Sequence, residues 1–150
     1  MHAGRRLFIK GGLAFVALIS LPKVLLAGVW PQKAFLSTAA SEALNDLFGT
    51  GQTTPSGEIT LGAPVIAENG AVVPVSVKTS LQGVESISIV VEKNPRPLAV
   101  YFEMSPESLP DVACRIKMGK TSNVMAVVKT SDGLFSATKE VKVTIGGCGG

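Results

Sequence analysis

Residues 111–118 read Asp-Val-Ala-Cys-Arg-Ile-Lys-Met, with apolar side chains at every second position. A period of two residues places alternate side chains on opposite faces of a β-strand, so this stretch predicts a strand that is buried on one face. The inward-facing set is Val112, Cys114, Ile116 and Met118. Cys114 is therefore predicted to act as a small buried hydrophobic residue, a common role for a free cysteine.

Six other stretches after residue 57 have the composition of strands. They are rich in β-branched residues and cover residues 58–61, 71–78, 84–92, 98–104, 123–130 and 135–145. Turn-forming pairs separate them, and Asp132-Gly133 is the clearest hairpin signal. Seven short strands at this spacing predict an all-β protein with the fold of an immunoglobulin-like β-sandwich.

The region before the strands is predicted to hold one short N-terminal helix. Leu44, Leu47 and Phe48 recur at helical spacing within residues 42–48, with Ser41 as the N-cap and Gly49 as the stop. Residues 30–37 form an apolar lead-in without a predicted element. Residues 49–57, which are rich in Gly, Thr, Pro and Ser, are predicted to be a loop.

The first 28 residues have the layout of an export signal. A positive segment with Arg5, Arg6 and Lys10 precedes an apolar run over residues 13–21, which is too short to span a bilayer. The adjacent arginines, followed by an apolar pair and a lysine, resemble a twin-arginine signal, whose substrates cross the membrane folded. An ordinary secretory signal with two arginines is the alternative. Either signal predicts a periplasmic protein without a membrane anchor.

We therefore predict three segments. They are a signal peptide at residues 1–28, a β-sandwich domain at residues 29–145 and a flexible Gly-rich arm at residues 146–150. Of the 14 basic residues, four lie in the first 28 residues, whereas all 11 acidic residues follow. The predicted mature chain thus has ten basic and 11 acidic residues, a net charge of −1, and lacks a basic run of the kind that binds nucleic acid.

The sequence offers little material for catalysis. Its one histidine, His2, falls within the predicted signal, so the mature chain lacks the imidazole of a Ser-His-Asp or Cys-His arrangement. Two cysteines without histidine do not predict a zinc site. No phosphate-binding glycine motif or calcium-binding loop is present. We therefore expect no catalytic residue, no metal and no cofactor in this chain.

The last five residues are Gly146-Gly147-Cys148-Gly149-Gly150. Four glycines bring no side chain to a core and leave the backbone conformationally free, which predicts a thin arm with one thiol near its tip. Such an arm suits a thiol that enters the active-site channel of another protein. A cysteine can hold sulfur reversibly as a persulfide. Because no basic residue next to Cys148 lowers its pKa, we expect partner enzymes to activate it, which makes the chain a carrier.

Other roles for Cys148 remain open at this point. It could pair with Cys114 in a structural disulfide, because an oxidising compartment permits one. It could form an intermolecular disulfide that links two copies of a structural β-sandwich module. It could also be the catalytic thiol of a periplasmic thiol oxidoreductase or persulfide transferase, although the sequence has no C-x-x-C motif.

The combination of a twin-arginine signal, an all-β domain and the final sequence Val-Lys-Val-Thr-Ile-Gly-Gly-Cys-Gly-Gly resembles one known family. This is the SoxY family, the sulfur-carrier subunits of the bacterial thiosulfate-oxidising (Sox) system. Residues 116–122, residues 126–133 and the Trp30-Pro31 opening of the predicted domain are also similar to that family.

The resemblance implies an immunoglobulin-like sandwich that pairs with SoxZ, a second small β-sandwich subunit. It places the attachment of thiosulfonate and persulfide intermediates on Cys148 and gives Cys114 no role. It further implies transient docking to a haem enzyme (SoxAX-like), which couples thiosulfate to the cysteine, and to a dimanganese hydrolase (SoxB-like), which releases sulfate. We expect the valines of residues 71–91 to form an exposed face that binds the partner subunit.

Overall fold

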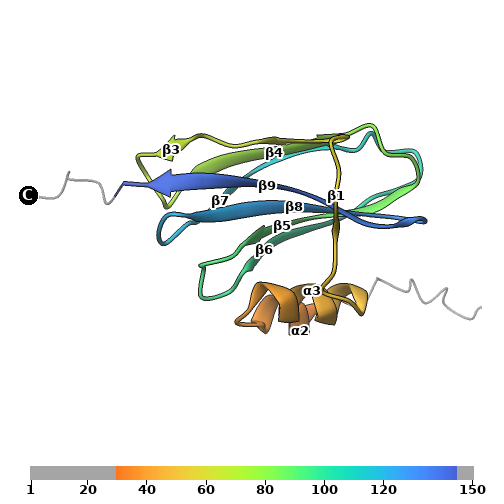
Figure 1. Ribbon diagram of the computed structural model, residues 1–150, viewed down its shortest axis with the longest axis horizontal. Helices are drawn as coiled ribbons and strands as arrows, with labels where there is room; N and C mark the ends of the chain where they lie inside the picture. Colours follow the sequence, from red (N-terminus) through yellow and green to blue (C-terminus); the bar gives the residue numbers. More distant parts are fainter. Residues whose placement is uncertain (1–29, 145–150) are drawn as a thin grey trace, which may run out of the picture. The chain divides into compact units, whose positions relative to one another are not determined.

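The computed structural model describes residues 30–144. Two short helices come first in this part of the chain, and nine strands follow them (Figure 1). The helices are α2 (Gln32–Leu36) and α3 (Ala40–Phe48). The strands are β1 (Thr54–Pro55), β2 (Ile59–Gly62), β3 (Ile66–Ala67), β4 (Val73–Thr79), β5 (Val84–Val91), β6 (Leu98–Glu103), β7 (Asp111–Ile116), β8 (Ser122–Thr130) and β9 (Gly133–Val143).

The strands form two sheets that pack face to face. The larger sheet has the order β1-β9-β8-β5-β6, with β3 also paired to β9, and the smaller sheet has the order β2-β4-β7. Neighbours pair antiparallel, except that β1 and β3 run parallel to β9. This arrangement confirms the predicted immunoglobulin-like β-sandwich with a short helical segment before it.

Each of the seven predicted strands is present, with ends within two residues of the predicted ones. The predicted hairpin at Asp132-Gly133 is confirmed, because Thr130 of β8 lies opposite Gly133 of β9. The prediction missed β1 and β3, which lie in segments taken as connections. Each has two residues, too few to show an alternating pattern.

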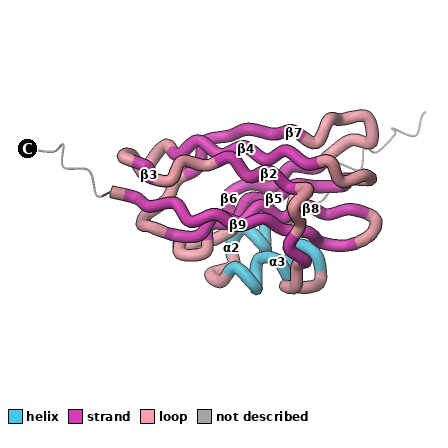
Figure 2. Tube along the Cα trace, turned by 45° about the horizontal axis from the view of Figure 1, so that its top comes forward, coloured by secondary structure: helices cyan, strands magenta, loops and turns pink. Residues whose placement is uncertain are grey.

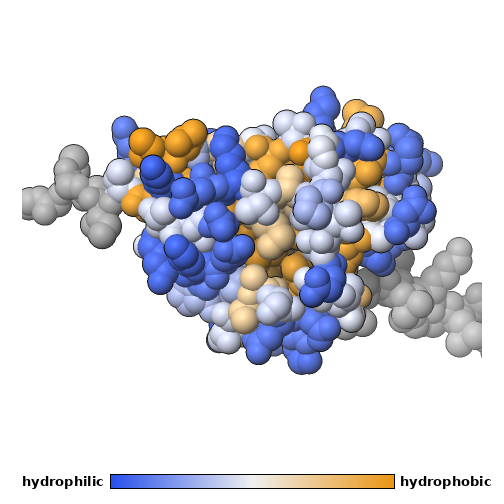
Figure 3. Space-filling view, viewed as in Figure 1, coloured by the Kyte–Doolittle hydropathy of each residue, from blue (hydrophilic) through white to orange (hydrophobic). Residues whose placement is uncertain are grey.

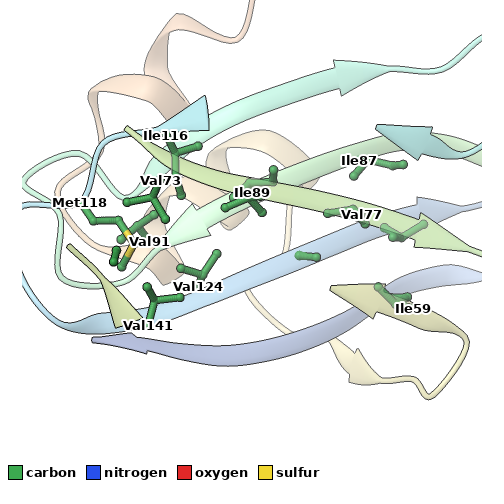
Figure 4. Close-up of a cluster of buried hydrophobic side chains, with 14 residues drawn as sticks. Ile59, Val73, Val77, Ile87, Ile89, Val91, Ile116, Met118, Val124 and Val141 are labelled. Carbon is green, nitrogen blue, oxygen red and sulfur yellow. The ribbon is translucent and has the colours of Figure 1, made fainter. Parts of the chain in front are cut away.

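The core between the sheets comes from alternate positions of the facing strands (Figure 4). Ile87, Ile89 and Val91 project from β5, and each is fully buried. Opposite them stand Val73, Val75 and Val77 of β4, which are at most 2% exposed. The expectation of an exposed valine-rich face within residues 71–91 was therefore wrong. The valines of β4 face inward because the whole inner face of the smaller sheet is covered by the larger one.

The other face of the larger sheet is covered by the helices (Figure 2). Val90 of β5 packs there with Ala43 and Leu44 of α3 in a second apolar cluster. Ser86 and Ser88 share this face of β5 and are also buried, and neither hydroxyl has a hydrogen-bond partner among residues 30–144. Strand β5 is thus buried on both faces, which explains why its sequence alternates only in part.

Helix α3 begins earlier than predicted. Its N-cap is Ala39, and no side chain caps it, so the assignment of Ser41 as N-cap was wrong. The predicted stop at Gly49 is confirmed, because Gly49 adopts a φ of 77° and its N–H donates to the Asn45 carbonyl at 2.8 Å. A left-handed C-cap of this kind favours glycine.

The unpredicted helix α2 explains the early start of α3. The two helices are separated by residues 37–39 alone and are held together by side chains. The Ser37 hydroxyl donates to the Asp46 carboxylate at 2.9 Å, and the Lys33 ammonium lies 2.6 Å from the same carboxylate. These contacts hold the pKa of Asp46 below its usual value, first through the hydrogen bond from Lys33 and then through the one from Ser37.

Gly70, in the turn between β3 and β4, allows a close approach of three segments. The Met118 N–H donates to the Gly70 carbonyl at 2.7 Å. A Cβ atom on Gly70 would lie 2.4 Å from the Met118 carbonyl oxygen and 2.9 Å from Cγ1 of Val143, both closer than van der Waals contact. Glycine is therefore required for this end of the sandwich to close.

The sandwich core predicts the effect of a cavity. Ile89→Ala removes most of a side chain that is fully buried between the sheets, and we expect the free energy of unfolding to fall by about 3 kcal/mol. Chemical denaturation with a spectroscopic readout measures it. Leu109→Ala, at a side chain that is 82% exposed, is the control and should change stability by less than about 0.5 kcal/mol. Equal losses in the two variants would contradict the described core.

The close approach at Gly70 predicts a second effect on stability. Gly70→Ala should lower the free energy of unfolding by about 1–3 kcal/mol, because the methyl group must displace the Met118 carbonyl or the Val143 side chain. Gly119→Ala is the matched control, since a Cβ there would have no neighbour within 4 Å. A stable Gly70→Ala variant with an unchanged denaturation midpoint would show that the three segments do not meet as described.

Candidate functional site

The predicted site residues fall outside the described part of the chain. These are the attachment site Cys148, the arm glycines Gly146, Gly147, Gly149 and Gly150, and the signal arginines Arg5 and Arg6. The predicted segment boundaries at residues 28 and 145 lie there too and stay predictions. The structure does describe the end of the sandwich from which the chain continues toward Cys148. We call it the arm-bearing end, defined by residues 67–72, 92–97, 117–121 and 141–144.

Strand β9 leads into this end and is hydrogen-bonded along both of its edges. One edge pairs with β8 from Gly133 to Val141. The other edge pairs with β1 and then with β3, where Ile66 lies opposite Lys142. The Lys142 N–H donates to the Val65 carbonyl at 3.0 Å, and the Thr144 N–H donates to the Ala67 carbonyl at 3.2 Å. The backbone is therefore held up to Thr144, four residues before Cys148.

Side chains connect the loops of the arm-bearing end to one another. The Asn94 amide donates to the Lys117 carbonyl at 2.7 Å and accepts from the Gly119 N–H at 3.2 Å. The Thr121 hydroxyl accepts from the Val143 N–H at 2.9 Å. The β5–β6 loop thus supports the β7–β8 loop, which in turn supports the end of β9.

Sequence reasoning missed these supporting residues. Asn94 and Gly119 lie between predicted strands, and residues 116–122, which include Gly119 and Thr121, resemble the SoxY family, but none of the three residues was assigned a role. Their roles depend on which loops meet at one end of the sandwich, which the sequence pattern does not specify. An extended chain spans at most about 3.5 Å per residue, so Cys148 lies no farther than about 14 Å from Thr144.

Cys114 occupies the inward-facing position predicted for it on β7, opposite Val75 of β4. It is half-buried and packs against the main core cluster, and it carries a free thiol. Its burial is incomplete because β7 is an edge strand of the smaller sheet. Burial raises the pKa of the Cys114 thiol, which keeps it protonated and weakly nucleophilic near neutral pH.

Within residues 30–144, neither a candidate metal site nor an ion pair lies at the arm-bearing end. No group of three or more His, Cys, Asp or Glu side chains within residues 30–144 is placed to hold a metal ion. The ion pairs found there are Lys33–Asp46, Lys78–Asp111 and Lys129–Glu85, and none includes a residue of the arm-bearing end. The helices of this region are also too short and too polar to cross a membrane. The arm-bearing end provides a hydrogen-bonded base for the segment that leads to Cys148.

Comparison with known proteins gives a consistent result. The family model for "Sulfur oxidation protein SoxY" matches residues 44–148. The solved structure of the sulfur carrier protein SoxY from Chlorobium limicola f thiosulfatophilum is 42% identical, with a TM-score of 0.61, and the match covers 69% of this chain and 94% of that one. No curated protein sequence gave a significant match.

A more distant likeness concerns the fold alone. The superoxide reductase (neelaredoxin) from Ignicoccus hospitalis is 21% identical, with a TM-score of 0.52, and the match covers 57% of this chain and 80% of that one. The match to the SoxY structure is much stronger, because it combines 42% sequence identity with coverage of 94% of that carrier protein. From the family match and the 42% identical carrier structure, we conclude that this chain belongs to the SoxY family of sulfur oxidation proteins and is a sulfur carrier, not an enzyme.

Proposed function

We propose that this chain carries sulfur intermediates covalently on Cys148 during thiosulfate oxidation in the periplasm. The observation that carries the proposal is the extent of the family match, which runs over residues 44–148 and so ends at Cys148. Cys114, the other cysteine, is half-buried on β7 with a raised thiol pKa, so it is poorly suited to carry exchangeable groups. The four glycines around Cys148 keep the arm narrow enough to enter an enzyme's channel.

The proposed chemistry has two steps on the Cys148 sulfur. In the first, the thiolate and the outer sulfur of thiosulfate form an S–S bond, which gives a cysteine thiosulfonate and releases two electrons to a haem enzyme. In the second, water attacks the terminal sulfonate at a dimanganese hydrolase, which breaks the bond between the two outer sulfur atoms. Sulfate and two protons leave, and a persulfide remains on Cys148, one of the reversible states of cysteine.

The chain's own part in these steps is positioning. The hydrogen bonds of Lys142 and Thr144 to the β3 segment fix the point from which the arm extends. The arm then limits the search of the thiol to a sphere of about 14 Å radius around Thr144. Holding a reactive group near its target raises its effective concentration, so one thiol can serve several enzymes in turn.

The proposal includes partners and a route of export. A small β-sandwich subunit of the SoxZ kind would pair with this chain, and SoxAX-like and SoxB-like enzymes would dock transiently. Arg5 and Arg6 would direct the folded complex through the twin-arginine route, which accounts for how a subunit without its own signal could reach the periplasm. No nucleic acid and no membrane anchor take part.

Replacement of the carrier thiol tests the proposed function directly. Cys148→Ser should abolish thiosulfate-dependent oxygen uptake in cells that depend on this gene, because serine cannot form the S–S bond. Cys114→Ser should keep most of the uptake and serves as the control. Both variants should remain folded by circular dichroism. Full uptake by the Cys148→Ser strain would show that the sulfur is carried elsewhere.

The environment of Cys114 predicts its reactivity. Because burial raises the pKa of its thiol, Cys114 in the folded Cys148→Ser variant should react with iodoacetamide at pH 7.5 more slowly than the same thiol in the unfolded chain. The rate should rise with pH as the thiolate forms, and unfolding in denaturant should remove the difference. A native-state rate equal to that of the unfolded chain would contradict the described position of Cys114.

A further inference from the structure

Charged residues are segregated between the two ends of the sandwich. The end opposite the arm-bearing end comprises the β4–β5 loop, the β6–β7 loop and the β8–β9 turn, together with the strand residues that adjoin them. Its acidic side chains are Glu85, Glu103, Glu107, Asp111 and Asp132. Glu58 lies beside it, where its carboxylate accepts a hydrogen bond from Ser80 of the β4–β5 loop at 3.3 Å. Its basic side chains are Lys78 and Lys129, and both are paired, with Asp111 at 3.7 Å and with Glu85 at 2.7 Å.

The arm-bearing end has the opposite balance. Exposed basic side chains lie on it or directly beside it, namely Lys93, Arg96, Arg115, Lys117, Lys120 and Lys142. Its acidic side chains are Glu68, Glu92 and Glu140. Arg96 donates to the Leu36 carbonyl of α2, and within residues 30–144 none of the six cations forms an ion pair. We call the other five cations the basic rim.

Exposed apolar residues lie on the arm-bearing end or directly beside it. Val65, Ile66 and Val72 are 62%, 55% and 48% exposed. Ile66 is the first residue of β3, Val65 precedes it and Val72 directly precedes β4. Apolar surface is visible at the position of β3 (Figure 3). Backbone pairing places them beside the basic rim. Ile66 lies opposite Lys142, and Val72 precedes Val73, which lies opposite Ile116, the neighbour of Lys117. We call these three residues the apolar patch.

The arrangement fits a protein surface better than a small anion. A site for a small anion needs several donors that converge on one point, often within a partly buried pocket. The basic rim instead comes from four separate strands and loops, and all five of its side chains are exposed. An apolar centre surrounded by charged residues is the usual composition of a protein–protein interface.

We infer that the arm-bearing end is the docking surface for the enzymes that act on Cys148, and that these enzymes present acidic residues around the entrance of their active-site channels. The inference rests on the proposed function, since it takes Cys148 as the group that is acted on. Cys148 follows Thr144 by four residues, so a protein seated on this end lies within reach of the thiol. Opposite charges on two such surfaces accelerate their encounter and orient it, which suits a carrier that must meet several enzymes briefly.

Charge reversal on the two ends provides a matched test. Lys117→Glu/Lys120→Glu changes the arm-bearing end, and Lys78→Glu/Lys129→Glu makes the same change in net charge at the opposite end. Each pair is built into a Cys148→Ser chain, so that binding is measured without sulfur transfer. The probe is the purified haem enzyme of the same organism's thiosulfate-oxidising system, and association is followed at about 20 mM and about 500 mM salt.

The docking inference predicts that Lys117→Glu/Lys120→Glu slows association at least about tenfold at low salt, whereas the control pair stays within about twofold. The difference should vanish at high salt, where the Debye length is only a few ångströms. Ile66→Ser should weaken binding at both salt concentrations, because it removes apolar contact. Equal effects of the two charge-reversal pairs would overturn the inference, as would a failure of the Cys148→Ser chain to bind at low salt.

Two further readouts distinguish docking from anion binding and from self-association. If Lys117→Glu/Lys120→Glu slows the reaction of Cys148 with an anionic aromatic disulfide but leaves enzyme binding unchanged, the rim attracts small anions and the docking inference fails. If Ile66→Ser alters the sedimentation of the protein alone and not enzyme binding, the apolar patch contacts a second copy and the inference also fails.

The proposed function is tested separately in the same mixture. Mass spectrometry of the wild-type chain shows whether a thiosulfate-derived group becomes attached to Cys148. Salt-dependent binding without loading would uphold docking and refute carriage on Cys148.

Discussion

The pairing of β9 along both of its edges is the constraint on which the rest of this structure depends. Strand β9 pairs with β8 on one side and with the short strands β1 and β3 on the other. The Lys139 ammonium of β9 also donates to the Ala63 carbonyl at 2.5 Å, which ties the segment between β2 and β3 to the same strand. Thr144, where the described part of the chain ends, thus belongs to the most interconnected part of the sandwich.

A carrier of covalently bound groups benefits from this arrangement. Ordering a backbone costs about 1–2 kcal/mol per residue, so a long flexible segment would lose much entropy each time it entered an enzyme. Here the backbone is already fixed four residues before Cys148. Under the proposed function, the entropic cost of presenting the Cys148 thiol is then confined to the residues after Thr144.

The fold was largely predictable because most strands are buried on one face only. For β7, inward and outward residues alternate in the sequence as they do in the structure. The alternation fails for β5, where α2 and α3 cover the second face and bury Ser86 and Ser88 as well. Helix propensity also placed the N-cap of α3 at Ser41. In the structure, the contacts of Asp46 with Lys33 of α2 and with Ser37 accompany an earlier start, with Ala39 as the N-cap. Tertiary contacts of this kind leave no local sequence pattern.

The candidate site was also only partly predictable from the sequence. Cys148 stood out because four glycines in five residues are unusual and local. The basic rim did not, because its five residues are spread between positions 93 and 142 and form no run in the sequence. Only the sandwich topology gathers them at one end, opposite the more acidic end. The valines of β4 were wrongly predicted to form an exposed binding face. A valine-rich stretch is as consistent with a core strand as with an exposed face, and here the strand is buried.

The central claim is that sulfur is carried on Cys148. Intact mass spectrometry of the protein isolated from thiosulfate-grown cells, with and without a reductant, tests it most directly. Carriage on Cys148 predicts reductant-labile additions of sulfur atoms or of a thiosulfate unit, which peptide mapping assigns to Cys148. A chain without such additions that has lost two hydrogens, mapped to a Cys114–Cys148 disulfide, would contradict it.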